Sequence, residues 1–169
     1  PATIASREHN MKDWRCDDWV EVMVKKIGKS KYFRWFDSGD VYSIELAKKI
    51  YQVMALTVNC KHWLPTRMYK DSNFIPLFEK MNDLANVVVR YSSDSIKGEL
   101  VQGSVTSTII ESADEFKPSK GESLCRAFTR KGKCDTCRAC WSKDVSVIKY
   151  ALHGNKVKDK WFAESPIAV

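Results

Sequence analysis

A short run of closely spaced cysteines constrains this chain more than any other feature. Thiolates are the ligands that zinc and iron–sulfur centres prefer, and a C-x-x-C step is about the shortest that lets two sulfurs face one metal. Gly132 and Lys133 are expected to form the turn that returns the first cysteine to the others. We therefore predict a four-cysteine metal centre in a loop over residues 125–141. The cysteines follow the spacing C-x8-C-x2-C-x2-C and are Cys125, Cys134, Cys137 and Cys140.

The spacing indicates which metal such a loop would bind. Structural zinc sites commonly use two C-x-x-C pairs that are well separated in the sequence. The overlapping C-x-x-C-x-x-C run is closer to the ferredoxin pattern, which favours a [4Fe–4S] cluster, although Trp141 stands where a ferredoxin has proline. Zinc stays open as the alternative. Disulfides or free core thiols are disfavoured because the spacing is regular and the sequence shows no sign of secretion.

Basic residues surround the cysteines and suggest an anionic partner. Lys and Arg number 28 against 21 Asp and Glu, which gives a net charge of +7. This excess permits a nucleic-acid partner without requiring one. The loop cations could instead offset the negative charge of four thiolates, or be solvated loop charges. The candidates for contacts with nucleic-acid phosphates are Arg130, Lys131, Lys133 and Arg138.

The remaining pattern predicts an α/β fold. The 169 residues are one domain's length, and the 44% hydrophobic content is ordinary for a soluble globular protein without a membrane-spanning run. Helices are expected at 18–27, 44–56 and 73–84, capped by Asp17 and Ser43 in the first two cases. Strands are expected at 32–36, 60–67, 86–91, 105–110 and 145–150, with a polar loop at 111–124. Strands alternating with helices favour a partial (β/α) barrel or an open, mostly parallel sheet. The predicted division is a single domain, 1–169, with a β/α core at 18–110, the metal loop at 125–141, and a last strand with a basic tail at 142–169.

Polar residues follow the predicted strands at one edge of the sheet. The carboxyl ends of parallel strands are where α/β proteins bind ligands, so these residues are candidates for substrate binding or acid–base catalysis. The alternative is that the carboxylates are helix caps and turn residues. His62, inside a predicted strand, is expected to be a hydrogen-bonded core residue. The candidate site residues are Asp37, Asp40, Arg67, Ser93, Asp94 and His153.

Four ordered segments resemble the phage "gene product 88" family: residues 34–42, 61–67, 86–95 and 132–141. The resemblance covers most of the chain and implies a phage origin, and therefore a place in the host cell cytoplasm. Members of that family are also distantly similar to radical-SAM (β/α) barrels, whose first cysteine motif lies in an N-terminal part ending in a Cys-Tyr-Ala run. This chain lacks that part, so a fragment is one expectation, and a homo-oligomer could complete the sheet.

Two functions follow from these features. In the first, the protein is a phage accessory protein with a structural metal centre that binds nucleic acid or a host nucleoprotein, for example to counter a host defence such as CRISPR. In the second, it is a truncated iron–sulfur enzyme acting on a nucleotide or another small polar substrate. No membrane partner is expected, and whether the chain is an enzyme stays open.

Overall fold

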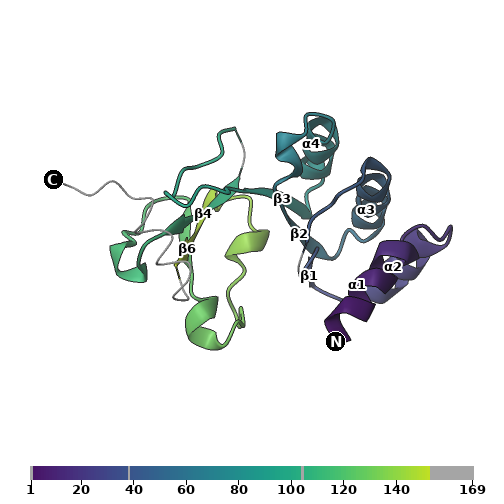
Figure 1. Ribbon diagram of the computed structural model, residues 1–169, viewed down its shortest axis with the longest axis horizontal. Helices are drawn as coiled ribbons and strands as arrows, with labels where there is room; N and C mark the ends of the chain where they lie inside the picture. The colour runs from purple at the N-terminus through teal and green to yellow at the C-terminus, as the bar shows by residue number, and fades with distance from the viewer. Residues whose placement is uncertain (1, 38, 104, 153–169) are drawn as a thin grey trace. The chain divides into compact units, whose positions relative to one another are not determined.

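A computed structural model describes residues 2–37, 39–103 and 105–152 of the chain (Figure 1). Two compact units make up the structure, and each is described in turn. The first unit comprises Pro1–Leu64 and Met68–Val87, and the second comprises Pro65–Arg67 and Val88–Val169.

Helices and two short parallel strands form the first unit. β1 and β2 run parallel, and Phe33 is the register partner of His62. α2 packs against α3, and α3 packs against α4, so the three helices lie side by side (Figure 1). Their apolar faces supply the core, in which Ile50, Phe78 and Met81 are fully buried. The elements are α1 (Ala2–Asp13), α2 (Trp19–Ile27), β1 (Tyr32–Arg34), α3 (Ile44–Leu56), β2 (Lys61–Thr66, which ends in the second unit), the 3-10 turn η1 (Met68–Lys70) and α4 (Ile75–Asp83).

The local sequence explains the bounds of these helices. Ser43 caps α3, since its hydroxyl oxygen accepts a hydrogen bond from the backbone nitrogen of Leu46 at 3.4 Å, and the predicted range 44–56 is confirmed. α2 begins after Asp18 rather than after the predicted cap Asp17, and Asp18 makes no side-chain capping bond. Pro76 lies in the first turn of α4, where a missing N–H removes no helical hydrogen bond.

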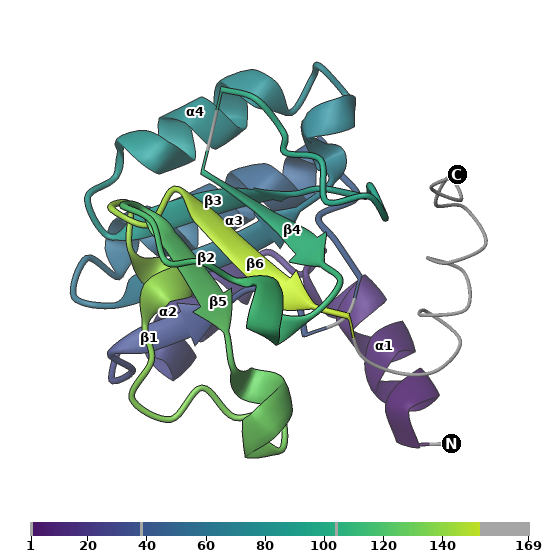
Figure 2. The same ribbon diagram turned by 90° about the vertical axis from the view of Figure 1, so that its left-hand side faces the viewer.

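Parallel strands dominate the second unit. β4 and β5 both pair with β6 in parallel, and β3 pairs with β4 in parallel. Figure 2 shows β4, β6 and β5 side by side, with β5 running directly into the segment that carries the other three clustered cysteines. The elements are β3 (Val87–Ser92), β4 (Thr106–Ile110), η2 (Ala113–Glu115), β5 (Glu122–Cys125), η3 (Ala127–Arg130), η4 (Ala139–Trp141) and β6 (Val147–Ala151).

The strands form a sheet in the order β1-β2-β3-β4-β6-β5, so the predicted α/β class with parallel pairing is confirmed. The sequence analysis did not predict α1, η2 or β5. α1 precedes the first predicted helix, and the polar loop predicted at 111–124 contains η2 and most of β5. Pro65 neither ends nor interrupts β2, which continues to Thr66. No helix in the described part of the chain is both long and apolar enough to cross a membrane.

Candidate metal centre

Paired strands hold the two ends of the cysteine segment. Cys125 is the last residue of β5, and Cys140 lies in η4, shortly before β6. β5 and β6 are hydrogen-bonded neighbours in which Cys125 is the register partner of Tyr150. The cysteine segment therefore begins at the end of β5 and returns to the sheet at β6, and the residues between the two strands form the loop.

Tight turns shape the loop between these ends. Lys131 and Gly132 both adopt left-handed backbone conformations, with φ of 53° and 79°, and the Gly132 nitrogen donates to the Ala127 carbonyl at 2.9 Å. The reversal thus lies one residue before the predicted Gly132–Lys133 turn. A second turn closes the C-x-x-C step, because the Cys137 nitrogen donates to the Cys134 carbonyl at 2.9 Å.

The four clustered cysteines line one cavity of about 200 Å³ in the second unit. Cys140 is buried, Cys125 and Cys134 are partly buried, and Cys137 is exposed. All six cysteines of the chain carry free thiols. Within residues 2–37, 39–103 and 105–152, no group of three or more His, Cys, Asp or Glu side chains is already arranged to hold a metal ion. The donor chemistry fits a thiolate-bound centre, since the cavity brings together four sulfur ligands and no carboxylate.

Burial favours the protonated form of two of these thiols, Cys140 and Cys125. It raises the pKa of Cys140 to about 11, although the positive charge of Arg90 acts in the opposite direction. Burial likewise raises the pKa of Cys125, against a backbone hydrogen bond at Ala127 and the charge of Arg130. A metal bound here would therefore displace protons, so its affinity would rise with pH.

A buried arginine lies near Cys140, one of the four cysteines of the cavity. Arg90 on β3 is 0% exposed, and within the described residues its guanidinium donates four hydrogen bonds to backbone carbonyls and none to a carboxylate. Burial lowers its pKa, while the neighbouring Cys140 and Tyr150 raise it. Its Nε atom is buried and has no hydrogen-bond partner in the part of the chain that the structure describes. The acceptors are Thr106 and Val145 at 2.9 Å, and Ser142 and Ser146 at 3.3 Å.

Arg90 was not among the predicted site residues. A strand was predicted at residues 86–91, and Arg90, the one charged residue in that otherwise mostly apolar run, was the available signal. A buried cation needs compensation, and the thiols beside it become anions when they bind a metal. Besides Arg90, Tyr150 on β6 also contacts Cys140, because a side-chain hydrogen bond joins its hydroxyl to the Cys140 thiol. Burial, followed by the nearby cysteines, raises the pKa of Tyr150.

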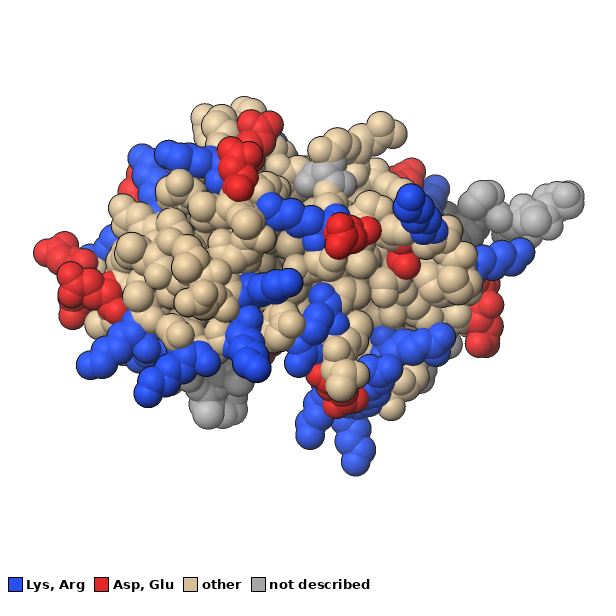
Figure 3. Space-filling model, turned by 180° about the vertical axis from the view of Figure 1, so that it is seen from behind, with Lys and Arg blue, Asp and Glu red and all other residues tan. Residues whose placement is uncertain are grey.

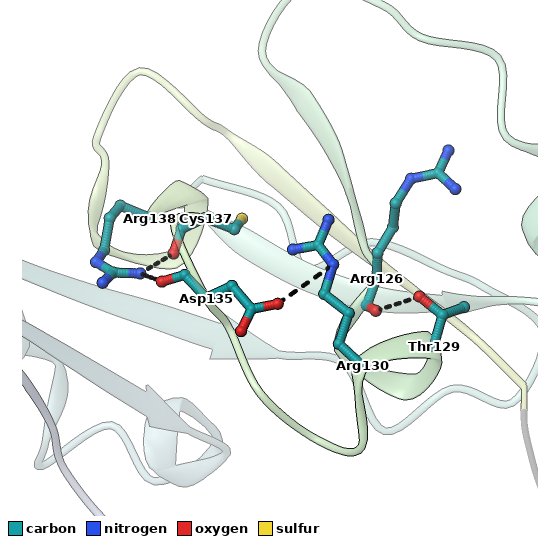
Figure 4. Close-up of polar contacts among 6 residues, drawn as sticks. All are labelled: Arg126, Thr129, Arg130, Asp135, Cys137 and Arg138. Atoms are coloured by element: carbon teal, nitrogen blue, oxygen red, sulfur yellow. Dashed lines mark hydrogen bonds and ion pairs between the residues drawn. The ribbon is translucent and has the colours of Figure 1, made fainter.

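The loop cations differ in what they contact (Figure 4). The Arg138 guanidinium donates to the carbonyls of Asp135 and Cys137 at 2.5 and 2.6 Å, and Arg130 lies 3.8 Å from the Asp135 carboxylate. The Arg126 guanidinium points away from this group in Figure 4. Lys131 and Lys133 are exposed. Two of the four predicted phosphate contacts therefore help to shape the loop, and the two lysines are the more accessible pair.

Comparison with known proteins decides the family. The family model described as Gene product 88 matches residues 1–143, which include the whole cysteine segment. The chain belongs to the Gene product 88 family. It is a family of phage gene products, as the resemblance implied. No curated protein and no solved structure matches the chain.

The other predicted site residues of this Gene product 88 chain fall into two groups. Arg67 and Ser93 come together in the second unit, where the Arg67 Nη2 lies 3.5 Å from the Ser93 carbonyl, and Asp94 is exposed one residue further on. Asp37 and Asp40 line a cavity of the first unit. The catalytic role proposed for these residues stays a prediction. His153 lies outside the described residues.

His62 is a hydrogen-bonded core residue. It is 0% exposed, its Nδ1 accepts from the Trp35 indole at 3.2 Å, and its Nε2 lies 2.8 Å from the Thr57 hydroxyl. Thr57 donates its own proton to the Val53 carbonyl at 2.6 Å, so it accepts one from His62 Nε2. Burial lowers the pKa of His62 to about 4, which keeps the ring neutral.

Proposed function

We propose that this phage protein binds one metal centre through Cys125, Cys134, Cys137 and Cys140, and that the centre stabilises the second unit. The observation that carries the proposal is that these four thiols, and no other potential ligands, line a single cavity. The buried, carboxylate-free Arg90 beside Cys140 supports it, because four thiolates around Zn²⁺ or [4Fe–4S]²⁺ leave net negative charge to balance a buried cation.

The centre is proposed to be structural, with [4Fe–4S] and zinc as the two candidates. Such a centre would join β5, the loop and η4 at one point, and its binding free energy would add to the stability of the folded state. Residues of the chain already fix the backbone around the four cysteines. The turns at Lys131 and at Cys134–Cys137 determine the path of the loop, and Arg90 binds backbone carbonyls just after Cys140.

Metal analysis with an optical spectrum, on protein purified anaerobically, tests this proposal directly. A brown sample with broad absorbance near roughly 400 nm and about four irons per chain would identify an iron–sulfur cluster. A colourless sample with about one zinc per chain would identify a structural zinc. Cys137→Ser should lose the metal, whereas Cys16→Ser, which changes an exposed cysteine of the first unit, should retain it. Metal-free wild-type protein, or equal metal content in both variants, would refute the proposal.

The partner proposed for this protein is nucleic acid or a host nucleoprotein, contacted by the basic loop. Lys131 and Lys133 are exposed on the same segment that carries the cysteines, so the metal centre would fix their positions. On the face in Figure 3, Lys and Arg side chains are spread widely with Asp and Glu among them, which favours a local contact over a large basic surface. Interference with a host defence such as CRISPR is one role that such a contact would allow.

Salt-dependent binding tests the partner. Fluorescence polarisation with short DNA and RNA duplexes should show affinity that falls with salt, by about 0.9 in the log–log slope for each phosphate contacted. The double change Lys131→Gln and Lys133→Gln should reduce that slope by about two. The matched control changes two exposed lysines of the first unit, Lys25→Gln and Lys48→Gln. Equal loss in both double variants would mean that net charge alone drives binding, and the loop would be excluded as the contact.

A further inference from the structure

A second and larger cavity occupies the first unit. Its volume is about 950 Å³, within the range of small-molecule sites and far above the voids of a close-packed interior. It opens among α1, α2, the end of β1 and the start of α3, which puts it beside the carboxyl end of a parallel strand. It shares no lining residue with the cysteine cavity. Six aromatic rings line it: Trp14, Trp19, Phe33, Trp35, Phe36 and Tyr42.

Hydrogen bonds hold several of these rings in place. The Trp35 indole donates to the neutral His62, and Phe33 packs edge-on against Trp35 with ring centroids 5.0 Å apart. On another wall the Trp14 indole donates to the Tyr42 hydroxyl at 2.7 Å, and the Lys49 ammonium binds the Trp14 carbonyl at 2.9 Å. The rings are thus positioned by the protein before any ligand arrives, which lowers the entropy cost of binding.

Backbone strain marks the same wall. Phe36 has a φ of 56°, a left-handed conformation that is unusual for a bulky side chain, and it lies two residues beyond the end of β1. Conformations of this kind are energetically unfavourable and cluster at ligand sites. Phe36 is followed at once by Asp37, whose side chain is fully exposed and pairs with Arg34 at 3.6 Å.

The charges of the cavity indicate the chemistry of its ligand. Carboxylates of Asp13, Asp37 and Asp40 line it, against the two fixed cations Lys26 and Arg34. This balance disfavours a phosphate, and it suits hydroxyl and amino groups that donate to carboxylates. Flat rings between aromatic walls are stabilised by stacking, and Asp or Glu commonly accepts hydrogen bonds from sugar hydroxyls or base amino groups.

We propose that this cavity binds a nucleoside, with its base between the aromatic rings and its amino and hydroxyl groups donating to Asp37 and Asp40. The nucleoside site does not depend on the metal centre or on the basic loop, so a negative result for one proposal would not refute the other. A nucleoside is preferred over a nucleotide because the carboxylates would repel a phosphate.

Isothermal titration of the full chain with adenosine, cytidine, uridine and adenosine monophosphate tests the proposal. Adenosine or cytidine should bind saturably, uridine more weakly for lack of an amino group, and the monophosphate about tenfold more weakly than adenosine. Asp40→Asn keeps an oxygen for the Val41 nitrogen, to which Asp40 bonds at 2.7 Å, yet should weaken nucleoside binding about tenfold. Asp83→Asn, an exposed carboxylate on α4 outside the cavity, is the matched control and should bind as wild type.

A second pair of variants tests stacking. Tyr42→Ala removes a cavity ring that is 47% exposed and should weaken nucleoside binding about tenfold. Tyr32→Ala is the control: this tyrosine is 38% exposed but does not line the cavity, so the variant should bind as wild type. Circular dichroism of each variant verifies folding. No saturable binding of any nucleoside up to about 1 mM would overturn the proposal. So would stronger binding of the monophosphate than of adenosine, or equal affinity in Asp40→Asn and Asp83→Asn.

Discussion

The indole nitrogen of Trp35 donates a 3.2 Å hydrogen bond to Nδ1 of His62, and this bond requires the imidazole to be unprotonated at that nitrogen. Because the Thr57 hydroxyl lies 2.8 Å from the other ring nitrogen, both nitrogens of the buried ring are engaged. The link joins β2 to the segment after β1, and we expect it to make the stability of the first unit sensitive to pH.

Acidification should destabilise the fold through His62. The unfolded imidazole takes up a proton as the pH falls through about 6.5, whereas the folded ring does so only near a pKa of about 4. The unfolded state therefore binds more protons between these values, and the free energy of unfolding should fall by about 3 kcal/mol from pH 7 to pH 4. Urea denaturation at several pH values measures this. His62→Gln should be less stable at pH 7 and should lack this part of the pH dependence; an unchanged slope would show that other groups cause it.

If the proposed metal centre is present, removal of the metal should destabilise at least the second unit. A four-cysteine centre contributes folding free energy directly, so chelation or Cys137→Ser should lower the thermal midpoint by more than about 5 °C. Cys16→Ser provides the same chemical change at an exposed cysteine outside the cavity and should leave the midpoint within about 1 °C. Calorimetry with hydrogen exchange would locate the loss. A midpoint unaffected by both chelation and Cys137→Ser would mean that the cysteines have no structural role.

Arg90→Met should be among the most destabilising single changes in the chain. It keeps much of the side-chain volume but leaves the four carbonyls that Arg90 binds without their donor, at a cost of about 3–5 kcal/mol. Arg126→Met, at an exposed arginine of the same unit, should change the free energy of unfolding by less than about 0.5 kcal/mol. Chemical denaturation compares the two, and equal values would rule out the structural role of Arg90.

The ion pair between Glu122 and Lys149 should stabilise the pairing of β5 with β6. The two side chains are 2.8 Å apart and only 20% and 24% exposed, and the hydrogen bond from Lys149 lowers the pKa of Glu122. Its contribution is present above pH 4.5 and is lost as the pH falls through the lowered pKa of the folded state. Glu122→Gln should cost about 1 kcal/mol at pH 7, whereas Glu79→Gln on the exposed face of α4 should cost almost nothing. If the two glutamine variants unfold alike, the pair adds no stability.

Local signals predicted the elements that have them. The helix at 44–56 carries a serine cap and an apolar stripe, and its bounds were predicted to the residue. α1 has a weak apolar face and lacks acidic residues in its first turn, so its sequence signals a helix only weakly, through Lys12 in its last turn. β5 has four residues of which only Leu124 is buried, and its pairing with β6 brings together residues about 25 positions apart, which periodicity cannot reveal.

The candidate sites also differ in how far local sequence signals predicted them. The cysteine segment is contiguous, so its spacing predicted which residues would meet at one cavity. Arg90 joins that group only through the tertiary fold, from a strand that reads as apolar core. The aromatic cavity is lined by rings on separate elements, spread along the sequence between Trp14 and Tyr42, so no single motif could have predicted it. Asp37 and Asp40 were predicted because they follow a strand directly.

β5 is the outermost strand of the sheet, and its last residue is the first cysteine of the cluster. Without the proposed metal centre, β5 would be held in the sheet by its four-residue pairing with β6. If β5 then separated from β6, the backbone of β6 would be exposed as a new edge of the sheet. Exposed edges recruit strands from other chains. If the proposed centre forms, a shortage of its metal would therefore favour aggregation and proteolysis of the newly made protein.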